Sequence, residues 1–482
     1  MKKKKREEER IGKVRMLTFG FLAVCVLTMS GLAGCTTTTV VDNGGEEIVE
    51  GKPTAMAISI PRVATYADNN ATSAEVQFKT ADIYVYGASL EKHVSKTLAD
   101  FTLDGDVYKM KDSIQVLSGN GKKIYVGLNL SAAAKAVIQN SGAYGVYQEA
   151  VSAALRDTIT SAGGGFAMFS VNTTANTTFN IESGVTSPRG ENKNVFPVTV
   201  ARLASKVTSL KADNIGTAPN NTASGVTFHP EIANGLKFCL GNVNTKTYPL
   251  QKISGSVVED PNYSSSPGLF NEFVNDYGAT PWNATASEYV DVNASSTAIT
   301  ARNTKYAVEN TSQSPYLQGA MTYASVRALF YPDYVVTGYN ATTNVIDTSG
   351  NTVVQNDLYV FTTAGGEYLY FTSATDTVAW ATDSDNPEAA GRKYLGNYKN
   401  GYCFYLIYLA PETAAQKAIY GDYATARNFC YTLNIKKFNA LGYPNPNEPN
   451  PNNPLGTQTH LTVDVTIQNW SLITTEHELG PL

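Results

Sequence analysis

The sequence is poor in the residue types that most often build catalytic and metal centres. Its 482 residues include 4 histidines and 5 cysteines, and none of these occurs with Cys-x-x-Cys or His-Glu-x-x-His spacing. It contains no Gly-x-Ser-x-Gly turn and no phosphate-binding P-loop. We therefore expect no enzyme activity, no bound metal and no cofactor. The formal net charge of −5, without a basic patch, also argues against a nucleic-acid partner.

Tryptophan is scarce as well, whereas tyrosine is abundant. The chain has 3 tryptophans, Trp282, Trp380 and Trp470, against 29 tyrosines. Aromatic pairs stabilise β-sheets without any ligand. We therefore interpret the tyrosines as sheet packing. A carbohydrate-binding surface lipoprotein, with an aromatic platform for glycans, is the alternative interpretation.

Long apolar runs are confined to the N-terminus, which has the pattern of an export signal. Basic residues are frequent in the first 15 positions, an apolar run covers 16–29, and a Leu-Ala-Gly-Cys tetrapeptide ends at Cys35. This tetrapeptide is typical of a lipobox, in which the cysteine is acylated and becomes the new N-terminus. Beyond Cys35 no apolar run approaches membrane length. We predict a signal peptide over 1–34 and a lipidated outer-membrane precursor.

The three remaining cysteines are an odd number for an exported protein. Cys403 and Cys430 lie in apolar, aromatic-rich runs, and Cys239 is distant from both in the sequence. Exported chains often form disulfides because their compartment is oxidising. The sequence leaves two alternatives open, three buried thiols or one disulfide with a leftover cysteine.

Short strand-like runs bounded by turn residues recur along the exported chain. They cover 74–78, 81–86, 123–128, 195–200, 358–362, 368–372, 402–409 and 429–435, with helical patterns at 147–159 and 413–420. Many short strands with few helices favour β-sandwich domains. We expect a mainly β protein with an N-terminal sandwich over 63–205 and a C-terminal sandwich over 206–440.

The C-terminus combines a Pro/Asn-rich linker with an amphipathic strand. Prolines fix φ, so the linker over 441–456 is expected to be an extended spacer that holds the last segment, 457–482, away from the body. In that segment four aliphatic residues alternate on one face, and a bulge near 468–469 would bring a tryptophan to the same face. These residues are Leu461, Val463, Val465, Ile467 and Trp470. Because a lone strand is not stable, it must join a sheet, its own or a neighbour's.

The segment 35–62 contains an N-terminal strand whose removal would open a groove for such a C-terminal strand. After a tether rich in Thr, Glu and Gly, residues 56–60 alternate large and small side chains and end at Pro61 and Arg62. Cleavage between Arg62 and Val63, where the backbone is expected to be accessible, would release the strand together with its lipid. The remaining groove would have apolar walls and one row of unpaired backbone groups. A neighbour's C-terminal strand could fill it.

These C-terminal patterns resemble a known family. Residues 424–438, the Pro/Asn linker and residues 459–466 are similar to Mfa-type shaft fimbrillins, the major subunits of short fimbriae in the type V pilus family of Bacteroidia. Weaker likeness runs through 202–207, 147–155 and the strand before Arg62, although the Ile-Pro-Arg context there departs from the family's version. The resemblance covers most of the exported chain.

The resemblance implies a fold and an assembly scheme. It implies two tandem transthyretin-like β-sandwich domains with a few short helices, export as a lipoprotein and cleavage by an Arg-specific protease. The C-terminal donor strand of one subunit then fills the groove of the next, head to tail. Implied partners are anchor and tip subunits and receptors on host or bacterial surfaces, in adhesion and biofilm formation.

Within fimbriae, a tip or anchor subunit is the alternative to a shaft subunit. A tip subunit need not donate a strand onward, and an anchor is expected to keep its lipid. The chain has both a removable N-terminal strand and a linker-borne C-terminal strand. This combination favours the shaft.

Overall fold

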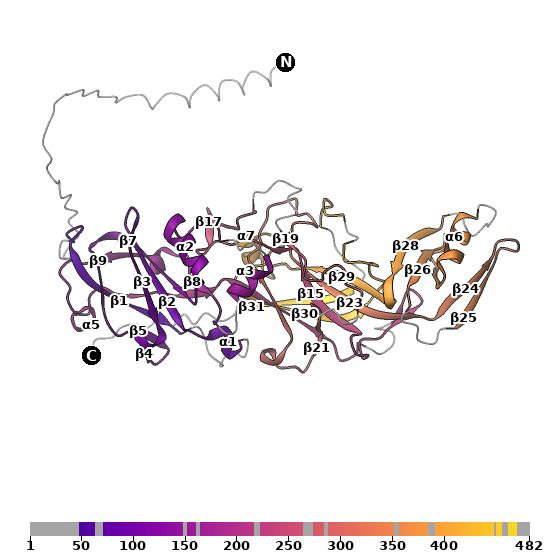
Figure 1. Ribbon diagram of the computed structural model, residues 1–482, viewed down its shortest axis with the longest axis horizontal. Helices are drawn as coiled ribbons and strands as arrows, with labels where there is room; N and C mark the ends of the chain where they lie inside the picture. Colours follow the sequence, from indigo (N-terminus) through magenta and orange to yellow (C-terminus); the bar gives the residue numbers. More distant parts are fainter. Residues whose placement is uncertain are drawn as a thin grey trace, which may run out of the picture. The chain divides into compact units, whose positions relative to one another are not determined.

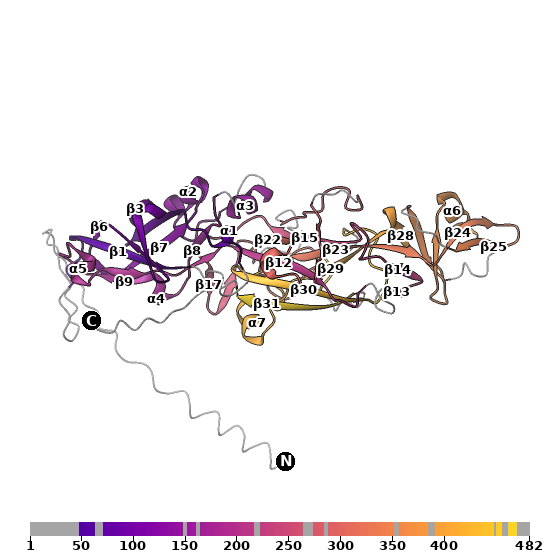
Figure 2. The ribbon, with the colours of Figure 1, turned by 90° about the horizontal axis from the view of Figure 1, so that it is seen from below.

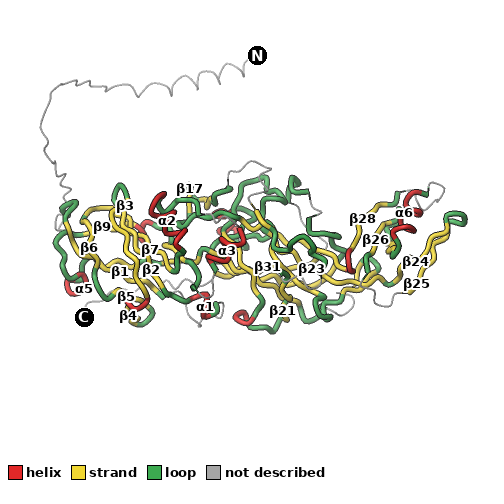
Figure 3. The backbone as a smooth tube through the Cα atoms, viewed as in Figure 1, coloured by secondary structure: helices red, strands yellow, loops and turns green. Residues whose placement is uncertain are grey.

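The computed structural model is mainly β, as Figures 1 and 3 show. It describes residues 48–62, 71–147, 152–160, 164–215, 222–263, 273–283, 288–350, 356–383, 391–447, 450–455 and 461–469. Residues 48–482 group into one compact unit by their contacts. Cys35, Val63 and Trp470 lie outside the described residues, so the lipidation site, the residue after the predicted cut and the predicted bulge tryptophan remain predictions.

The first pair of sheets encloses one apolar core. One sheet contains β1 (Pro53–Pro61), β4 (Phe101–Asp104), β5 (Val107–Met110), β6 (Ile114–Leu117) and β10 (Val195–Pro197). The other contains β2 (Thr80–Tyr86), β3 (Leu90–Thr97), β7 (Gly119–Leu128), β8 (Met168–Ser170), β9 (Thr178–Ile181) and β11 (Val200–Arg202). Ile58 from the first sheet and Val85 and Ile124 from the second are buried in the same core. This is a β-sandwich, because alternating side chains of both sheets fill one interior.

Two helices cover the outer face of the second of these sheets. In α2 (Ala132–Ser141) Ile138 is buried, and in α3 (Ser152–Ile159) Leu155 is buried; both join a core with Tyr84. The hydroxyl of Ser131 caps α2 by accepting from the Ala134 N–H at 3.1 Å. Of the helix predicted over 147–159, the structure describes Ser152–Ile159, whereas Tyr147 forms an antiparallel bridge with Thr247.

The second pair of sheets encloses the largest core. One sheet contains β12 (Ala204–Lys211), β21 (Asn293–Ala294), β22 (Thr304–Val308), β30 (Phe429–Phe438) and β31 (Leu461–Asn469). The facing sheet contains β13 (Thr222–Ala223), β14 (Val226–Phe228), β15 (Leu236–Gly241), β20 (Val290–Asp291), β23 (Tyr323–Pro332) and β29 (Tyr402–Tyr408). Val207, Val326 and Leu433 are buried in their common core. In Figures 1 and 2, β31 lies beside β30 in both views.

A further sheet is inserted between β23 and β29. It contains β24 (Tyr334–Asn340), β25 (Val345–Gly350), β26 (Leu358–Thr362), β27 (Tyr368–Phe371) and β28 (Lys393–Tyr398), with α6 (Ala374–Thr382) packed against it. Trp380 of α6 is fully buried, with its ring 5.1 Å from Phe361 and 5.4 Å from Phe371. The strands at 358–362 and 368–372 were predicted, but their gathering into a separate sheet was not.

Short elements connect these sheets. They are α1 (Ser73–Val76), α4 (Thr174–Thr177), α5 (Pro188–Glu191) and α7 (Ala414–Tyr420), and the two-stranded pairs β16 (Val243–Asn244) with β19 (Phe273–Val274) and β17 (Lys252–Ser254) with β18 (Val257–Glu259). The predicted helix at 413–420 is confirmed by α7. The predicted strand at 74–78 is wrong. Thr72 and Glu75 form a capping box that begins the short helix α1 instead.

The mainly β prediction is confirmed, with two sandwiches and a few short helices. The predicted boundary residue Ser205 lies at the start of β12, three residues after β11 ends at Arg202. The assignment of 63–205 and 206–440 to separate domains remains a prediction. The predicted strand at 195–200 is interrupted, because Pro197 ends β10 and a new strand, β11, starts at Val200 in the other sheet.

A buried ion pair connects α1 to the second pair of sheets. The Lys206 ammonium in β12 lies 3.0 Å from the Glu75 carboxylate, and both side chains are almost fully buried. The Tyr306 hydroxyl donates to the same carboxylate at 2.6 Å. The Arg202 guanidinium donates to the Glu75 carbonyl at 2.7 Å and to Asn428 at 3.1 Å. Because removing one partner of a buried pair leaves an uncompensated charge, loss of either Glu75 or Lys206 should be strongly destabilising.

Candidate functional site: the two terminal strands

The N-terminal strand β1 lies inside its sheet, with partners on both edges. Residues 57–59 pair in parallel with β10, residues 59–61 pair antiparallel with β5, and residues 53–56 pair antiparallel with β6. The sequence predicted one row of unpaired backbone groups after removal of this strand. The number of unpaired rows is larger than predicted, because the strand has hydrogen-bonding neighbours on two sides. Its removal would leave unpaired groups on both walls of the gap.

The side chains of β1 are core residues. Met56, Ile58 and Ile60 are at most 1% exposed and belong to the core of the first sandwich. The intervening Ala57 is also buried, whereas Ser59 is half-buried. The predicted alternation of large and small residues therefore describes a strand whose large side chains fill the core and whose small ones face a closely packed second side.

Polar side chains also hold the first half of β1. The Asn194 amide donates to the Ala55 carbonyl at 3.1 Å and to the Glu182 carbonyl at 2.9 Å. The Thr54 hydroxyl accepts from the Val185 N–H at 3.0 Å. Since residues 182–194 come from a distant part of the sequence, the seat of β1, meaning the position that it occupies between its neighbours, depends on tertiary contacts. No local sequence pattern predicts them.

Arg62 follows directly after β1 and is half-buried. Its backbone N–H donates to the Asp106 carbonyl at 2.7 Å, which extends the pairing with β5 by one residue. The structure therefore places the predicted cleavage residue at the very end of the enclosed strand. The scissile bond to Val63 remains a prediction.

The C-terminal strand β31 pairs with its own chain. It runs antiparallel to β30, with Phe438 opposite Leu461 and Phe429 opposite Asn469. The register shifts between Ile435 and Lys437 of β30, while the pairing of Gln468 and Asn469 is unbroken. The irregularity thus lies at the opposite end of the strand from the predicted bulge.

Among the described strands, β31 has a single partner. It is the edge of its sheet, beyond β30. Val463 is half-buried and packs against the core of the second sandwich. Leu461, Val465 and Ile467 are placed in β31 by their backbone pairing, but their side chains are outside the described set. Of the two possibilities that the sequence left for this strand, the single chain shows pairing with its own sheet.

The Pro/Asn linker does not stand away from the body. Its backbone pairs with the chain at both ends, as Tyr443 bridges to Phe404 and Pro454 bridges to Leu317. Pro444 and Pro446 are buried. The expectation of a free extended spacer is therefore wrong for the described residues of the linker, which lie against an aromatic surface.

The remaining candidates from the sequence are packing residues. Cys239, Cys403 and Cys430 are buried free thiols, so the disulfide alternative is not realised. Burial raises the pKa of the Cys430 thiol to about 11, which leaves it protonated and unreactive near neutral pH. Trp380 is buried and Trp282 packs against an inner aromatic cluster, so neither tryptophan forms an exposed platform for glycans.

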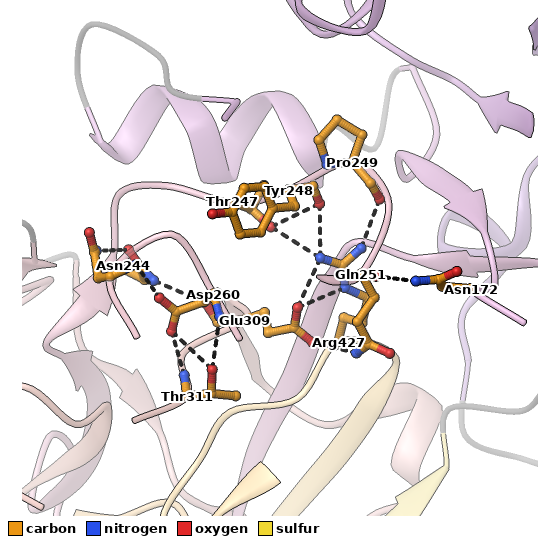
Figure 4. A network of polar contacts seen from close by, with 11 residues as sticks. Asn172, Asn244, Thr247, Tyr248, Pro249, Gln251, Asp260, Glu309, Thr311 and Arg427 are labelled. Carbon is orange, nitrogen blue, oxygen red and sulfur yellow. Dashed lines mark hydrogen bonds and ion pairs between the residues drawn. The ribbon is translucent and has the colours of Figure 1, made fainter. Parts of the chain in front are cut away.

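A polar network that the sequence did not reveal lies next to the ends of β22 and β30, and Asn172, which follows β8, donates to its Gln251 carbonyl (Figure 4). The Arg427 guanidinium contacts the Glu309 carboxylate at 2.9 Å and donates to the Pro249 and Tyr248 carbonyls, both at 2.8 Å. The Gln251 amide donates to Glu309 at 2.6 Å. Arg427 and Glu309 are almost fully buried, and each charge is compensated by the other.

One carboxyl beside this network is strongly perturbed. Asp260 is 3% exposed, and burial raises its pKa to about 7 despite hydrogen bonds from the Thr311 and Asn262 N–H groups. Asn262 donates to Asn244, and Asn244 donates to the Glu309 carbonyl, so the two parts of Figure 4 are connected. The group lies in a closed structural network, which does not resemble a catalytic cleft.

The described residues form neither a metal-ion cluster nor a membrane-spanning helix. No group of three or more His, Cys, Asp or Glu side chains in the described ranges could hold a metal ion. Within the same residues, no helix is long and apolar enough to cross a membrane.

Comparison with known proteins places the C-terminal region in a family. Residues 396–476 match the model described as major fimbrial subunit protein type IV, fimbrillin, C-terminal. No match was found among curated proteins. Among solved structures, a fimbrilin from Porphyromonas gingivalis W83 is 14% identical, with 88% of this chain and 99% of that one covered and a TM-score of 0.45. The tip fimbrial protein Mfa3 from Porphyromonas gingivalis, with C-terminal truncation, is 10% identical, with 87% and 100% covered and a TM-score of 0.34.

These structural likenesses are too distant to carry an assignment, whereas the family match is specific to a stretch that runs from β28 into the last strand. The stretch includes the segment 424–438, the linker and the segment 459–466, on which the sequence resemblance rested. The match over residues 396–476 confirms the fimbrillin resemblance in this region of the chain.

Proposed function

We propose that this chain is a structural shaft subunit of a cell-surface fimbria. It is exported as a lipoprotein through Cys35, cut after Arg62 and polymerised head to tail by strand exchange. The fimbrillin match over 396–476 supports a fimbrial role and a cell-surface location. A subunit of this kind acts by assembly and needs no catalytic group.

The seat of β1 is the observation that carries the proposal. The strand fills the core with Met56, Ile58 and Ile60, yet its only covalent link to the rest of the sandwich leads through Arg62. One cut there would allow the whole strand to leave. The sandwich would then have a slot with apolar walls and unpaired backbone groups on two sides, which fits an added strand.

The pairing of β31 gives exchange a favourable direction. Within the described part of its own chain, β31 forms one ladder, with β30. In the slot of a cleaved neighbour, the strand would form ladders with the strands that paired with β1, namely β5, β6 and β10. The four aliphatic side chains predicted on one face would replace those of β1, and burial of each contributes about 1.5–3 kcal/mol. Leaving β30 exposes one edge, whose backbone groups can be hydrated.

The proposed partners follow from this scheme. They are further copies of the chain, tip and anchor subunits, an Arg-specific protease and receptors on host or bacterial surfaces. Adhesion and biofilm formation would be functions of the filament, since no single described site suits a small ligand.

N-terminal sequencing of purified filaments tests the proposal. We expect the first residue to be Val63. Arg62→Ala should leave the full lipoprotein as a monomer, because β1 stays in its slot, and Arg62→Lys should separate an Arg-specific protease from one that accepts any basic residue. A filament subunit that begins at or near Cys35, or filaments formed by Arg62→Ala, would contradict the proposed processing.

A further inference from the structure

We infer that the described residues 442–447 and 450–455 form a fixed strap, which stays on its own subunit when the C-terminal strand is exchanged. Only the chain after Leu455 then passes to the neighbour. This inference rests on the strand exchange proposed above. It concerns which part of the C-terminus moves, and it replaces the free spacer expected from the sequence.

The strap packs against the face of β23 that points away from the core of the second sandwich. All ten residues of β23 are buried, so both faces of this strand are shielded from water. One face contributes Val326 and Phe330 to the core of the second sandwich. The other face contributes Tyr323 and Leu329 to a separate cluster rich in tyrosine. Two strap residues, Tyr443 and Leu455, pack against this cluster.

The first half of the strap is held by reciprocal backbone bonds. The Tyr443 N–H donates to the Phe404 carbonyl and the Phe404 N–H donates to the Tyr443 carbonyl, both at 2.8 Å. The Tyr398 hydroxyl donates to the Gly442 carbonyl at 2.9 Å. A Cβ atom at Gly442 would lie 2.5 Å from the Phe404 carbonyl oxygen, so glycine permits this close approach.

The second half of the strap is held against residues 316–319. The Gln318 N–H donates to the Asn453 carbonyl, the Gly319 N–H donates to the Pro451 carbonyl, and the Leu455 N–H donates to the Tyr316 carbonyl, all at 2.9 Å. Between the two halves, the Tyr277 hydroxyl donates to the Asn447 side chain at 2.7 Å. Both described parts of the strap are thus anchored, up to Leu455.

The composition of the strap suits a fixed path. Proline has no N–H to satisfy and fixes φ, so a proline-rich segment loses little freedom when it is held by its carbonyl groups. Two asparagine side chains also fold back onto the strap. Asn445 accepts from the Asn447 N–H at 2.7 Å, and Asn450 accepts from the Asn452 N–H at 3.0 Å. Release of the strap would uncover aromatic side chains, whereas release of β31 opens one ladder.

Two engineered disulfides separate the movements. The strap lock is Leu317→Cys with Pro454→Cys. The bonds that flank this bridge are those of a non-hydrogen-bonded antiparallel pair, whose Cα atoms lie about 4.5 Å apart, within disulfide range. The strand lock is Thr432→Cys with Thr466→Cys, which are direct partners in the β30–β31 ladder. The native thiols Cys239, Cys403 and Cys430 are buried, and each single cysteine variant controls for effects on folding.

The full chain with each lock is oxidised, processed at Arg62 and examined by electron microscopy, with and without reductant. We expect the strap lock to form filaments like the unmodified chain, and the strand lock to form none until it is reduced. Loss of filaments in the strap lock, restored by reductant, would overturn the fixed strap while leaving strand exchange intact. Filaments from the oxidised strand lock would instead contradict strand exchange itself, and the inference with it.

Discussion

The two terminal strands both belong to sheets, but they differ in their number of partners and in their burial. β1 lies between neighbours and buries Met56, Ile58 and Ile60 in a core, whereas β31 is an edge strand with β30 as its partner among the described strands. Loss of β1 removes part of a hydrophobic core together with backbone pairing on two sides. Loss of β31 removes one ladder. Removal of β1 would therefore disturb the sandwich more than removal of β31, which is the contrast that the proposed exchange of strands requires.

The strongest test of this contrast is a charge in the seat of β1. Ile58→Asp should lower the free energy of unfolding by more than about 4 kcal/mol, because an unpaired carboxylate would be buried in the core. Ser59→Asp, on the half-buried side of the same strand, should cost far less. Urea unfolding of the uncut precursor measures both. Equal losses would mean that β1 does not distinguish its two faces.

A charge on the aliphatic face of β31 is expected to act mainly on assembly. Val465→Asp should leave a folded precursor, yet remove filaments, because in a neighbour's slot the carboxylate would be buried without a partner, at a cost of several kcal/mol. Thr466→Lys, on the opposite face by alternation, is the matched control and should still assemble. Size-exclusion chromatography with electron microscopy reads out both variants. Filaments from Val465→Asp would show that this face is not the one inserted.

A pH series extends the comparison to the sheets that hold β31, because the pKa of Asp260 beside them is raised. Folding raises this pKa from 3.8 to about 7, so the native state binds a proton more tightly than the unfolded state. Stability should therefore be highest below pH 4 for this group and fall as the pH rises toward 7, by roughly 1.4 kcal/mol per pH unit. Asp260→Asn should remove this slope in thermal unfolding. An unchanged slope would assign it to other groups.

The smallest effect is expected from shortening a side chain of β31. Val463→Ala removes part of a half-buried contact with the core, so it should cost about 1 kcal/mol, whereas Ile58→Ala should cost about 2–5 kcal/mol. Urea midpoints of the uncut chain measure the difference. If the two costs were equal, β31 would be as firmly seated as β1, and its release would need another cause.

The sequence predicted those parts of the molecule that depend on local patterns. The alternation in β1, its end at Arg62 and the strands at 81–86, 123–128 and 429–435 follow from period-two patterns and turn residues, and the structure has strands there. The error at 74–78 arose because a short run with Val76 and Phe78 suits a strand by pattern. The capping pair Thr72 and Glu75 was present in the sequence and indicated a helix start.

What could not be predicted depends on contacts between distant segments. The neighbours of β1 come from 107–117 and 195–197, and no periodicity identifies them. The linker has the composition of an extended segment, which is correct, but composition cannot show that Phe404 and Leu317 bind it. The partners of Arg427 and Asp260 likewise come from several loops. Glu309 compensates the buried charge of Arg427, and burial raises the pKa of Asp260. No linear sequence pattern reveals either contact.

The pairing of β12 with β30 has a mechanical consequence. These strands are parallel, with Lys206 opposite Cys430 and Lys211 opposite Ile435. In the proposed filament under tension, β12 would be pulled backward through Arg202, toward the sandwich that holds one neighbour. Once the strap bonds gave way, β30 would be pulled forward through Phe438, toward the other neighbour. The two strands would then slide along each other, and all the hydrogen bonds of the ladder would share the force at once. Separation of the two strands would then require shearing the whole ladder, and not breaking its hydrogen bonds one after another.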